Sequence, residues 1–550
     1  MMSRKGSFSI RKLMSPEEAV NLIKDGDTVT VSGMSGVNVP DLVLANLEAR
    51  FLKTGRPQGL TVTGSSFEAG NGIERFAHEK MLKRYIGTWF YLYHRLRDLI
   101  SANKIEAYCF PLITHHHWIR EIARGSVGLI THIGINTSYD PRILGGKLNE
   151  STKEDLVEII NLKGKEYLLY LSMPINVAII RGTTADEDGN ISQEKESFKA
   201  GVFYQAMAAR NSGGVVIAQV ERLARAGSIH PRMVEVPGTL VDAIVLDPKQ
   251  PDNSAFPDRV IQGTTGEIEV PYPTINPIPL SAEKVIARRC CMEIGLGQNV
   301  NVGVGIPMRD ITNVSIEEDI ETLYRIMVEH GTYGGLSFAI SQQINPTYFF
   351  SYSELLDFWN GGGLDLCFLG IGEVDVNGNL NIDRWRGNLV GAGGAPDIAY
   401  NAKKLVFCGT LTSGGVRHYV ENGKISILKE GANKRFVKKT GWISINCKDL
   451  VQMGREVLFI TERAVFKLTK EALLLTEIAP GIDIGRDVIS QMEYTPSIRS
   501  DPKIMEAAIF REEKMGLRSR FDIPAAPGKK FRGSLLEIRG NFERIGTKTK

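Results

Sequence analysis

The chain has 550 residues, of which 43% are hydrophobic and 23% charged, an ordinary composition for a globular protein. This length exceeds what one hydrophobic core usually supports, so we expect two or more domains. The net charge of +3 gives no reason to expect binding to nucleic acid or to a membrane, and no apolar run approaches the roughly 20 residues that span a bilayer.

Helix and strand signals alternate along the chain. The basic N-terminal stretch lacks the apolar core of a signal peptide, so we expect a cytoplasmic protein. Residues 15–26, SPEEAVNLIKDG, predict a helix with a serine cap, and residues 27–33, DTVTVSG, predict a strand. Short apolar runs bounded by glycine, typical of strands buried on both faces of a parallel sheet, follow at 213–220, 299–307, 364–375 and 403–410.

Seven prolines between residues 248 and 279 mark a boundary between two halves, because such a density excludes a regular helix or strand. The halves echo each other in order: residues 23–44 resemble 294–314, and 182–192 resemble 370–382. We therefore predict an α/β fold of two related open α/β domains with largely parallel sheets and the active site at the domain interface. The predicted divisions are an N-terminal domain at 1–246, a proline-rich linker at 247–279, a C-terminal domain at 280–515 and a basic extension at 516–550.

Glycine loops follow several of the predicted strands. The loops at 33–36 (GMSG) and 303–307 (GVGIP) match only part of GxGxxG, and no GxxxxGK[ST] occurs, so we expect no dinucleotide site. Two further clusters stand at 360–366 and 391–398. Each loop either presents backbone N–H groups to a ligand or is only a tight turn.

One carboxylate stands out in residues 327–335, MVEHGTYGG. Glu329 follows a hydrophobic pair, as at the end of a strand that enters a core, and precedes Gly331, Gly334 and Gly335. Glycine permits tight turns and close approach of another group. The pattern predicts a half-buried carboxylate that a ligand or a backbone segment approaches closely.

Metal and disulfide chemistry find little support. His115, His116 and His117 are consecutive, so from a helix or a strand they cannot all face one ion, and no HExxH pattern occurs. The six cysteines include no CxxC pair, which favours buried reduced thiols. We expect no metal, and we interpret the basic residues at 528–550 as a solvated extension.

An ordered set of motifs carries a family resemblance: GVGIP, VEHGTYGG (328–335), GGGLDLCFLG (361–370), GAGG (391–394), FCGT (407–410) and ITERAVFKL with EIAPGIDI between 460 and 484. The chain resembles the class I acyl-CoA:carboxylate CoA-transferases, specifically the single-chain propionate/acetate type. The resemblance covers roughly residues 10–515. It implies an active site between two open α/β domains and a homo-oligomer, a dimer or a tetramer.

The resemblance also implies a chemistry. Glu329 is then the nucleophile that becomes a glutamyl-CoA thioester while CoA passes from a short-chain acyl-CoA to a carboxylic acid, as in the metabolism of short-chain fatty acids and ketone bodies. Coenzyme A is a substrate, and no other cofactor and no metal is expected. The expected oxyanion and substrate glycines are Gly393, Gly394, Gly33 and Gly36, and the expected CoA-binding glycines are Gly303, Gly305, Gly334 and Gly335.

The segment after Glu329 departs from the family pattern. Relatives carry a small residue and then Gly-Pro-Ile-Gly-Gly, where this chain has His330 and then Gly-Thr-Tyr-Gly-Gly. Since neighbours on a strand face opposite ways, we expect His330 to point away from the substrate and Tyr333 to narrow the acyl pocket. Two other functions stay open: an acyl-CoA hydrolase of the same fold, and a non-catalytic ligand-binding protein that retains the fold.

Overall fold

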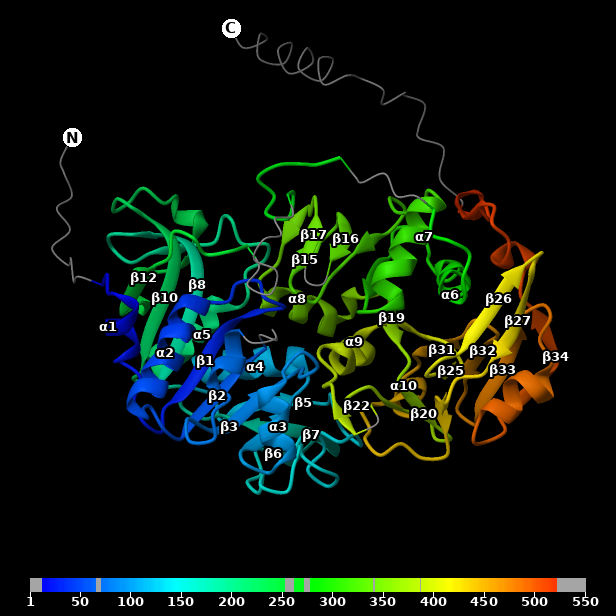
Figure 1. Cartoon of the computed structure of the whole chain (residues 1–550), viewed down its shortest axis with the longest axis horizontal. Helices are drawn as coiled ribbons and strands as arrows, with labels where there is room; N and C mark the ends of the chain where they lie inside the picture. Colours follow the sequence, from blue (N-terminus) through cyan, green and yellow to red (C-terminus); the bar gives the residue numbers. More distant parts are fainter. Residues whose placement is uncertain are drawn as a thin grey trace, which may run out of the picture.

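The computed structural model describes residues 12–65, 71–252, 262–271, 277–339, 342–385 and 387–521. The chain forms two halves that lie side by side, each built around one large sheet (Figure 1). The ends of the chain, with most of the basic extension, and part of the proline-rich segment lie outside the described residues. The division into domains at 1–246 and 280–515 stays a prediction.

The first half contains a nine-stranded sheet with the order β11-β9-β8-β1-β2-β3-β4, to which β10 and β12 add beside β8. Neighbouring strands run parallel except at β9, which is antiparallel to β8 and β11. The bounds are β1 (Thr28–Met34), β2 (Leu60–Ser65), β3 (Leu82–Gly87), β4 (Glu106–Cys109), β8 (Val177–Asp186), β9 (Ile191–Ser192), β10 (Val215–Ala224), β11 (Val234–Val236) and β12 (Ala243–Leu246).

The second half contains an eight-stranded sheet with the order β14-β13-β19-β24-β31-β32-β33-β34. Its strands are parallel from β14 to β31, and β32 is antiparallel to both of its neighbours. The bounds are β13 (Asn299–Val302), β14 (Arg325–Ile326), β19 (Leu366–Gly370), β24 (Lys404–Cys408), β31 (Glu456–Ile460), β32 (Ala464–Leu468), β33 (Leu473–Ile478) and β34 (Ser497–Ile504).

Helices and small sheets complete the two halves. Helix α4 packs on α5 in its own half and on α8 and α9 of the other half, so it lies at the junction (Figure 1). The helices are α1 (Pro16–Val20), α2 (Asp41–Thr54), α3 (Arg95–Ser101), α4 (Leu112–Ala123), α5 (Val202–Asn211), α6 (Ala282–Cys291), α7 (Thr312–Glu317), α8 (Tyr352–Phe358), α9 (Ala395–Asn401) and α10 (Cys447–Gln452). The small strands are β5 (Gly128–Thr131), β6 (Val157–Leu162), β7 (Lys165–Leu171), β15 (Thr332–Tyr333), β16 (Leu336–Ala339), β17 (Gln342–Ile344), β18 (Tyr348–Phe349), β20 (Glu373–Asp375), β21 (Asn379–Asn381), β22 (Arg384–Trp385), β23 (Asn388–Leu389), β25 (Thr412–Ser413), β26 (Arg417–Glu421), β27 (Lys424–Lys429), β28 (Asn433–Lys434), β29 (Phe436–Val437) and β30 (Ile445–Asn446).

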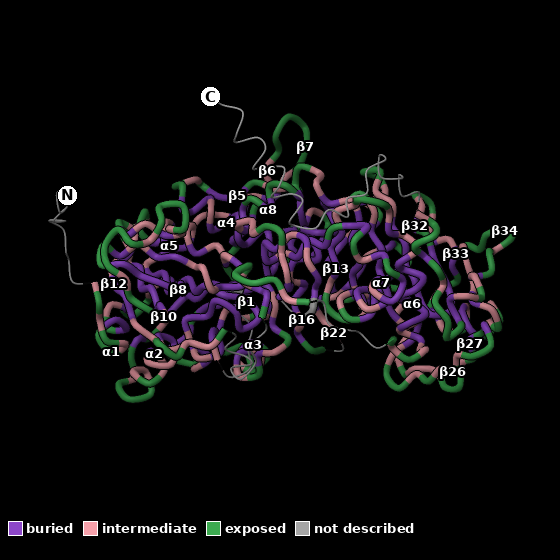
Figure 2. Tube along the Cα trace, turned by 90° about the horizontal axis from the view of Figure 1, so that it is seen from above, coloured by how far each residue is buried: buried purple, intermediate pink, exposed green. Residues whose placement is uncertain are grey.

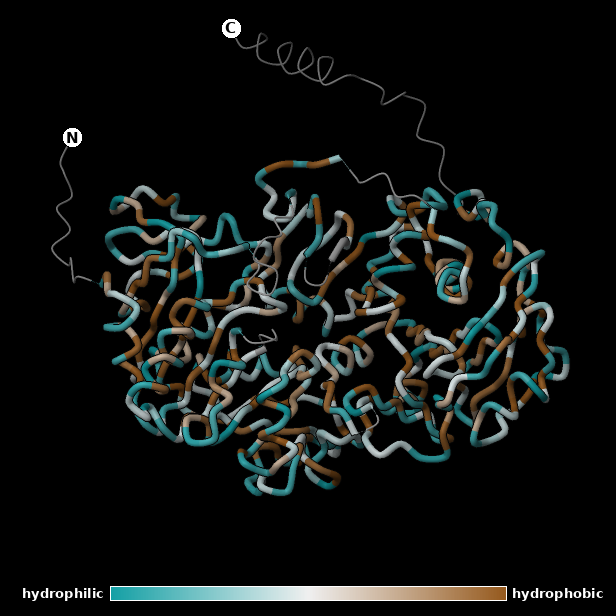
Figure 3. The backbone as a smooth tube through the Cα atoms, in the orientation of Figure 1, coloured by the Kyte–Doolittle hydropathy of each residue, from teal (hydrophilic) through white to brown (hydrophobic). Residues whose placement is uncertain are grey.

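The strands at the centre of the sheets are buried, as the glycine-bounded apolar runs predicted. Every residue of β1 and β8 is buried, and Figure 2 shows buried segments running through both halves. Hydrophobic stretches of the backbone follow these strands in Figure 3. One core cluster joins Ala19 in the first half to Met492 in the second, so the halves share a hydrophobic interior.

The first predicted helix is shorter than its sequence pattern. Ser15 caps α1 and forms a capping box with Glu18, as expected. After Val20, however, the backbone amides of Asn21 and Leu22 bond three residues back, at 3.2 and 3.1 Å. The helix therefore tightens into turns before Gly26.

Two matching turns support the relation between the halves. Asp186 Oδ1 accepts from the backbone N–H of Asn190 at 2.9 Å, and its Oδ2 accepts from the Asn190 side chain at 3.0 Å. Asp375 and Asn379 repeat this pair of bonds, both at 3.0 Å. Each aspartate sits where a strand of one half turns back, so the resemblance between residues 182–192 and 370–382 is also a resemblance in structure. Among the described residues, no helix is long and apolar enough to cross a membrane.

Candidate active site

Glu329 lies at the corner of a tight turn that follows β14. The backbone N–H of Gly331 donates to the Val328 carbonyl at 3.0 Å, and the N–H of Val328 donates to the Thr332 carbonyl at 3.1 Å. Gly331 has a φ of +105°, and a Cβ there would lie 2.4 Å from the Phe350 carbonyl oxygen. Glycine is therefore required at this position. The expected strand ends earlier than its pattern indicates, and the carboxylate projects from a turn.

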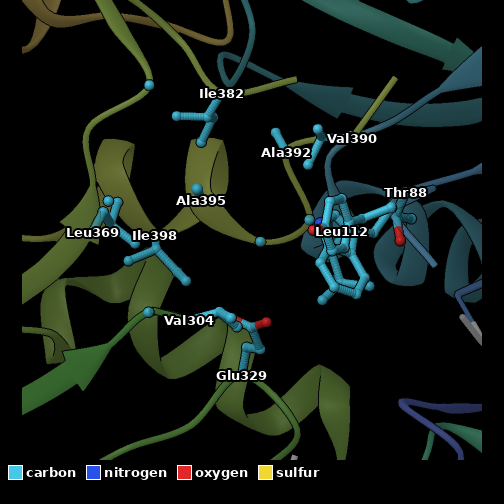
Figure 4. A pocket seen from close by; sticks show the side chains of 18 of the residues that line it. Thr88, Leu112, Val304, Glu329, Leu369, Ile382, Val390, Ala392, Ala395 and Ile398 are labelled. Atoms are coloured by element: carbon cyan, nitrogen blue, oxygen red, sulfur yellow. The ribbon is translucent and has the colours of Figure 1, made fainter. Parts of the chain in front are cut away.

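A cavity of about 450 Å³ opens in front of Glu329. Figure 4 shows the Glu329 side chain at this cavity beside Val304, on the side opposite Ile382. Both halves line it: the first with Met34, Thr88, Trp89, Tyr91 and Leu112, the second chiefly with residues 369–372 and 390–395. Most of the lining side chains are apolar, and of the described residues that line the cavity only Glu329 and Arg435 are charged.

Gly394 brings backbone against the carboxylate. A Cβ built on Gly394 would lie 3.1 Å from Glu329 Oε2 and 3.3 Å from Ile398 Cδ1. Its φ is −82° and ψ −4°, a conformation open to any residue, so glycine is needed here for space rather than for backbone freedom. Gly394 stands immediately before α9, and its N–H has no acceptor among the described residues.

Gly393 is tied to the first half. Its backbone N–H donates to the Thr88 carbonyl at 3.0 Å, and its carbonyl accepts from the N–H of Leu112 at 2.9 Å. The N–H of Phe90 donates to the Val390 carbonyl at 2.7 Å. The GAGG loop is thus held by backbone bonds to the opposite half. Because the Gly393 N–H is already engaged, the expected oxyanion role falls to Gly394, and that role stays a prediction.

The remaining glycines lie at varied positions. Gly303 lines the cavity, whereas Gly33, Gly36, Gly305, Gly334 and Gly335 are not among the residues that line it. Of the loop at 33–36, Met34 reaches the cavity. Cβ atoms at Gly334 and Gly335 would lie 2.4 Å from Thr347 Oγ1 and 2.2 Å from the Ile344 carbonyl oxygen. These two glycines therefore let a neighbouring segment of the chain pass, and their expected contact with CoA stays a prediction.

Comparison with known proteins identifies the family of the chain. A family model described as Coenzyme A transferase matches residues 13–247. Acetate CoA-transferase YdiF of Escherichia coli (strain K12) is 36% identical over 514 residues, which cover 92% of this chain and 96% of that protein. Caffeate CoA-transferase of Acetobacterium woodii is 35% identical over 520 residues, covering 92% and 98%. The chain belongs to the coenzyme A transferase family. It is a CoA-transferase, and it acts on acyl-CoA and carboxylic acids.

Solved structures of the family share the fold. The apoenzyme of the acyl-CoA transferase YdiF from Escherichia coli O157:H7 superposes with a TM-score of 0.88 at 35% identity, covering 94% of this chain and 98% of that one. A structure of the same enzyme described as a thioester complex with CoA gives a TM-score of 0.87. The predicted α/β fold of two open domains is confirmed.

Burial controls the charge of Glu329 in this CoA-transferase. The carboxylate is half-buried, with protein on all sides except toward the cavity, and this burial raises the pKa of Glu329 to about 7. Tyr352 lies nearby: burial, and then the Glu329 charge, raise the pKa of its hydroxyl. That hydroxyl contacts Met34 Sδ at 3.8 Å. A carboxylate that is poorly hydrated at neutral pH is a better nucleophile than one in water.

The histidines near the site have separate partners. His115 Nε2 lies 2.6 Å from Thr63 Oγ1, and His116 stacks on Tyr352 with ring centroids 4.1 Å apart. His117 Nε2 lies 3.5 Å from a carboxylate oxygen of Asp357. Burial lowers the pKa of His115 to about 3 and that of His117 to about 4, so both rings are neutral near pH 7. Within the described ranges, no group of three metal-ligating side chains occurs.

His330 is buried behind the turn and does not line the cavity. Its ring packs on Phe198 with centroids 5.2 Å apart, and burial lowers the pKa of His330 to about 3. It points away from the cavity as expected, but because of the turn geometry and not because of strand alternation. Tyr333 packs edge-on against Phe350 and also lies outside the lining, so its expected contact with the acyl group is not seen.

Two residues of the site had no signal in the sequence. Asp397 in α9 is fully buried and accepts hydrogen bonds from the N-terminus of α4 in the other half. Arg435 precedes β29 and reaches the cavity over the ring of Trp385. Asp397 lies within the glycine cluster at 391–398, but that pattern assigned no role to its carboxylate, and Arg435 lies in none of the motifs. Only the fold shows what the two side chains contact.

Proposed function

We propose that the protein transfers CoA from a short-chain acyl-CoA to a carboxylic acid through a covalent thioester on Glu329. The observation that carries the proposal is the position of Glu329, a carboxylate in a mostly apolar cavity with the Gly394 backbone in contact range. The names of two relatives, an acetate and a caffeate CoA-transferase, support carboxylic acids as acceptors. Acetate, propionate, butyrate and acetoacetate are the proposed acids, and a homo-oligomer is the proposed assembly.

The first half-reaction loads the enzyme. A Glu329 oxygen attacks the thioester carbonyl of the acyl-CoA, the carbon–sulfur bond breaks, and CoA leaves as a thiolate from a mixed anhydride. The thiolate attacks the Glu329 carbonyl carbon, and the first acid leaves as a carboxylate. Glu329 then carries CoA as a thioester. The free energy of the thioester is kept, so the transfer needs no ATP.

The second half-reaction reverses these steps with a new acid. Its carboxylate attacks the glutamyl thioester, CoA thiolate leaves, and the thiolate then attacks the new acyl carbonyl and frees Glu329. Each attack passes through a tetrahedral oxyanion, which preorganised N–H donors stabilise by about 3 kcal/mol each. Gly394 is the proposed donor, because its N–H has no acceptor among the described residues and its Cα lies against Glu329.

Intact-mass spectrometry after incubation with an acyl-CoA and no acceptor acid tests the proposal. The expected result is a mass increase of one CoA less one water, mapped to Glu329 after proteolysis, and parallel double-reciprocal plots in steady-state exchange. The control is the Glu329→Gln variant, whose mass should not increase under the same conditions. An unmodified enzyme that still exchanges CoA, with intersecting plots, would contradict the covalent mechanism.

The same samples separate transfer from hydrolysis. Loss of acyl-CoA is measured with and without an acceptor acid. A transferase consumes acyl-CoA steadily only when the acid is present, whereas a hydrolase consumes it at the same rate without the acid. A protein that only binds its ligand consumes acyl-CoA under neither condition.

A further inference from the structure

Arg435 is a charged group in the cavity for which the transfer chemistry has no use. Among the described residues that line the cavity it is the only cation, and its surroundings there are mainly apolar. The residue precedes β29 in the second half, and its guanidinium lies 5.1 Å from the centroid of the Trp385 ring. Burying a cation in apolar surroundings costs free energy unless an anion pairs with it.

The described residues accept hydrogen bonds from only some of the N–H groups of Arg435. Nη1 donates to the carbonyl of Ile371 and, at 3.3 Å, to that of Gly372. Nε is buried and has no hydrogen-bond partner. Among the described residues no carboxylate lies within ion-pair distance of Arg435, and burial lowers the pKa of its guanidinium. Nη2 also has no acceptor in the part of the chain that the structure describes, but it is not among the enclosed unpaired atoms, so a ligand can reach it.

Arg435 and Glu329 lie in different parts of the cavity. Figure 4 places Ile382 across the cavity from Glu329. Arg435 lies on the Ile382 side, because it donates to the Gly372 carbonyl, and a Cβ on Gly372 would be only 3.3 Å from the Ile382 Cα. A substrate whose reacting carbonyl is at Glu329 therefore directs another part of itself toward Arg435.

We propose that Arg435 binds an oxyanion of the substrate remote from the reacting carbonyl. An arginine fork suits a carboxylate or a phosphate, and its face is already fixed by the indole of Trp385. The oxyanion comes either from a second carboxylate on the acid or from a phosphate of CoA. The inference rests on the proposed function in one respect, that the substrate occupies this cavity.

The test compares pairs of ligands of which only one carries the remote oxyanion. Calorimetric titration measures the affinity of succinate against butyrate, and of CoA against pantetheine, for the wild type and for Arg435→Met. A charge-assisted hydrogen bond contributes enough binding energy that its loss should lower the affinity for the ligand with the remote oxyanion at least about tenfold. The affinity for the ligand of each pair that lacks this oxyanion should change less than about threefold. Arg417→Met, at an exposed position on β26, is the matched control and should change no affinity.

The outcomes separate the two sources of the oxyanion. A loss confined to succinate assigns Arg435 to the acid, and a loss confined to CoA assigns it to a phosphate. Unchanged affinity for both anions in a variant with an unchanged thermal melt overturns the proposal. If Arg435→Met does not fold, Arg435→Lys replaces it. The affinity for the ligand with the remote oxyanion should then fall at least about threefold relative to the affinity for the ligand of the pair that lacks it. An unchanged ratio of these two affinities overturns the proposal.

Failure of the proposed function gives a different pattern. An enzyme that forms no CoA adduct on Glu329, yet loses succinate or CoA affinity in Arg435→Met, retains the oxyanion site and refutes only the covalent mechanism. An enzyme that forms the adduct, yet binds all four ligands equally well in both forms, refutes only the oxyanion site.

Discussion

Asp397, in the second half, accepts a hydrogen bond of 2.7 Å from the hydroxyl of Thr114, in the first. The same carboxylate accepts from the backbone N–H groups of Ile113 and Thr114, both at 3.0 Å. These N–H groups open helix α4, so a residue of one half caps a helix of the other. Asp397 stands three residues after Gly394, and the cap therefore fixes the helix on which the glycine of the site depends.

We expect Asp397→Ala to destabilise the protein and disturb the site together. Three buried donors lose their acceptor, which lowers the free energy of unfolding by roughly 2–4 kcal/mol. Because Gly394 shifts with α9, kcat should fall more than KM rises. Chemical denaturation and steady-state kinetics measure the two effects. Asp357→Ala is the control: it breaks the exposed cross-half pair with Arg120 (2.8 Å) and should cost under about 1 kcal/mol. Equal effects of the two variants would refute the capping role.

Glu329→Gln should fold and lose nearly all transfer activity. An amide forms no anhydride with an acyl group, so we expect exchange to drop at least about a thousandfold. Radiolabel exchange between acyl-CoA and free acid measures this directly, and circular dichroism checks the fold. Retention of a tenth of the wild-type rate would show that another group is the nucleophile.

The raised pKa of Glu329 predicts how stability depends on pH. Because the folded-state pKa, about 7, lies above the unfolded value of 4.5, ionisation costs stability as the pH rises from 4.5 through 7. Glu329→Gln removes that cost, so its gain over the wild type should be on the order of 1–2 kcal/mol at pH 8, allowing for water in the cavity, and should vanish near pH 4. Paired thermal melts at the two pH values measure it. A gain that is the same at both would contradict the assignment.

The same pKa predicts the pH dependence of the first half-reaction. Glu329 must be ionised to attack, so kcat/KM for acyl-CoA should rise about tenfold per pH unit below pH 7 and level off above it. Single-turnover loading, measured without an acceptor, keeps the ionisation of the second acid out of the profile. A rise centred near the ordinary value of 4.5 would show that burial does not perturb the nucleophile.

Substitution at Gly394 should impair turnover while sparing the fold. Since its φ of −82° suits any residue, Gly394→Val strains no backbone, but the new side chain meets Glu329 Oε2 and Ile398. We expect kcat to fall at least about a hundredfold with a small change in melting temperature. Gly361→Ala is the control, because a Cβ there meets nothing within 4 Å. Wild-type turnover in Gly394→Val would move the search for oxyanion donors to the loop at 33–36.

The sequence predicted the fold well because its signals are local. The runs that became β10, β13, β19 and β24 are apolar and bounded by glycine, and such runs have few alternatives in an α/β protein. Glu329 was singled out from its glycine neighbours and the family motifs, and its role as the nucleophile stays a prediction. The glycines indicated a tight turn or a close approach, but not the partner: the need for Gly331 comes from the carbonyl of Phe350, a contact made only in the folded chain.

Long-range partners explain what the sequence could not reveal. Thr114 and Asp397 are separated by 283 residues, and neither residue type is unusual near a helix end. Arg435 meets Trp385 from a different small sheet. For Gly334 and Gly335 the pattern indicated a ligand, and the structure adds a second reason for glycine: a Cβ on either would meet Thr347, Ile344 or Asn345 of the chain itself. Their contact with CoA stays a prediction.

The backbone bonds of Gly393 to Thr88 and Leu112 mean that the cavity at Glu329 is built jointly by the two halves of the chain. Either half, produced alone, would lack one wall of the cavity and hold the GAGG loop by one edge only. Two such fragments, cut within the proline-rich segment, should each be inert and should recover transfer on mixing, as in enzyme complementation. The single chain would then serve to guarantee equal amounts and fast pairing of the two halves, and the chemistry itself would not depend on an unbroken chain.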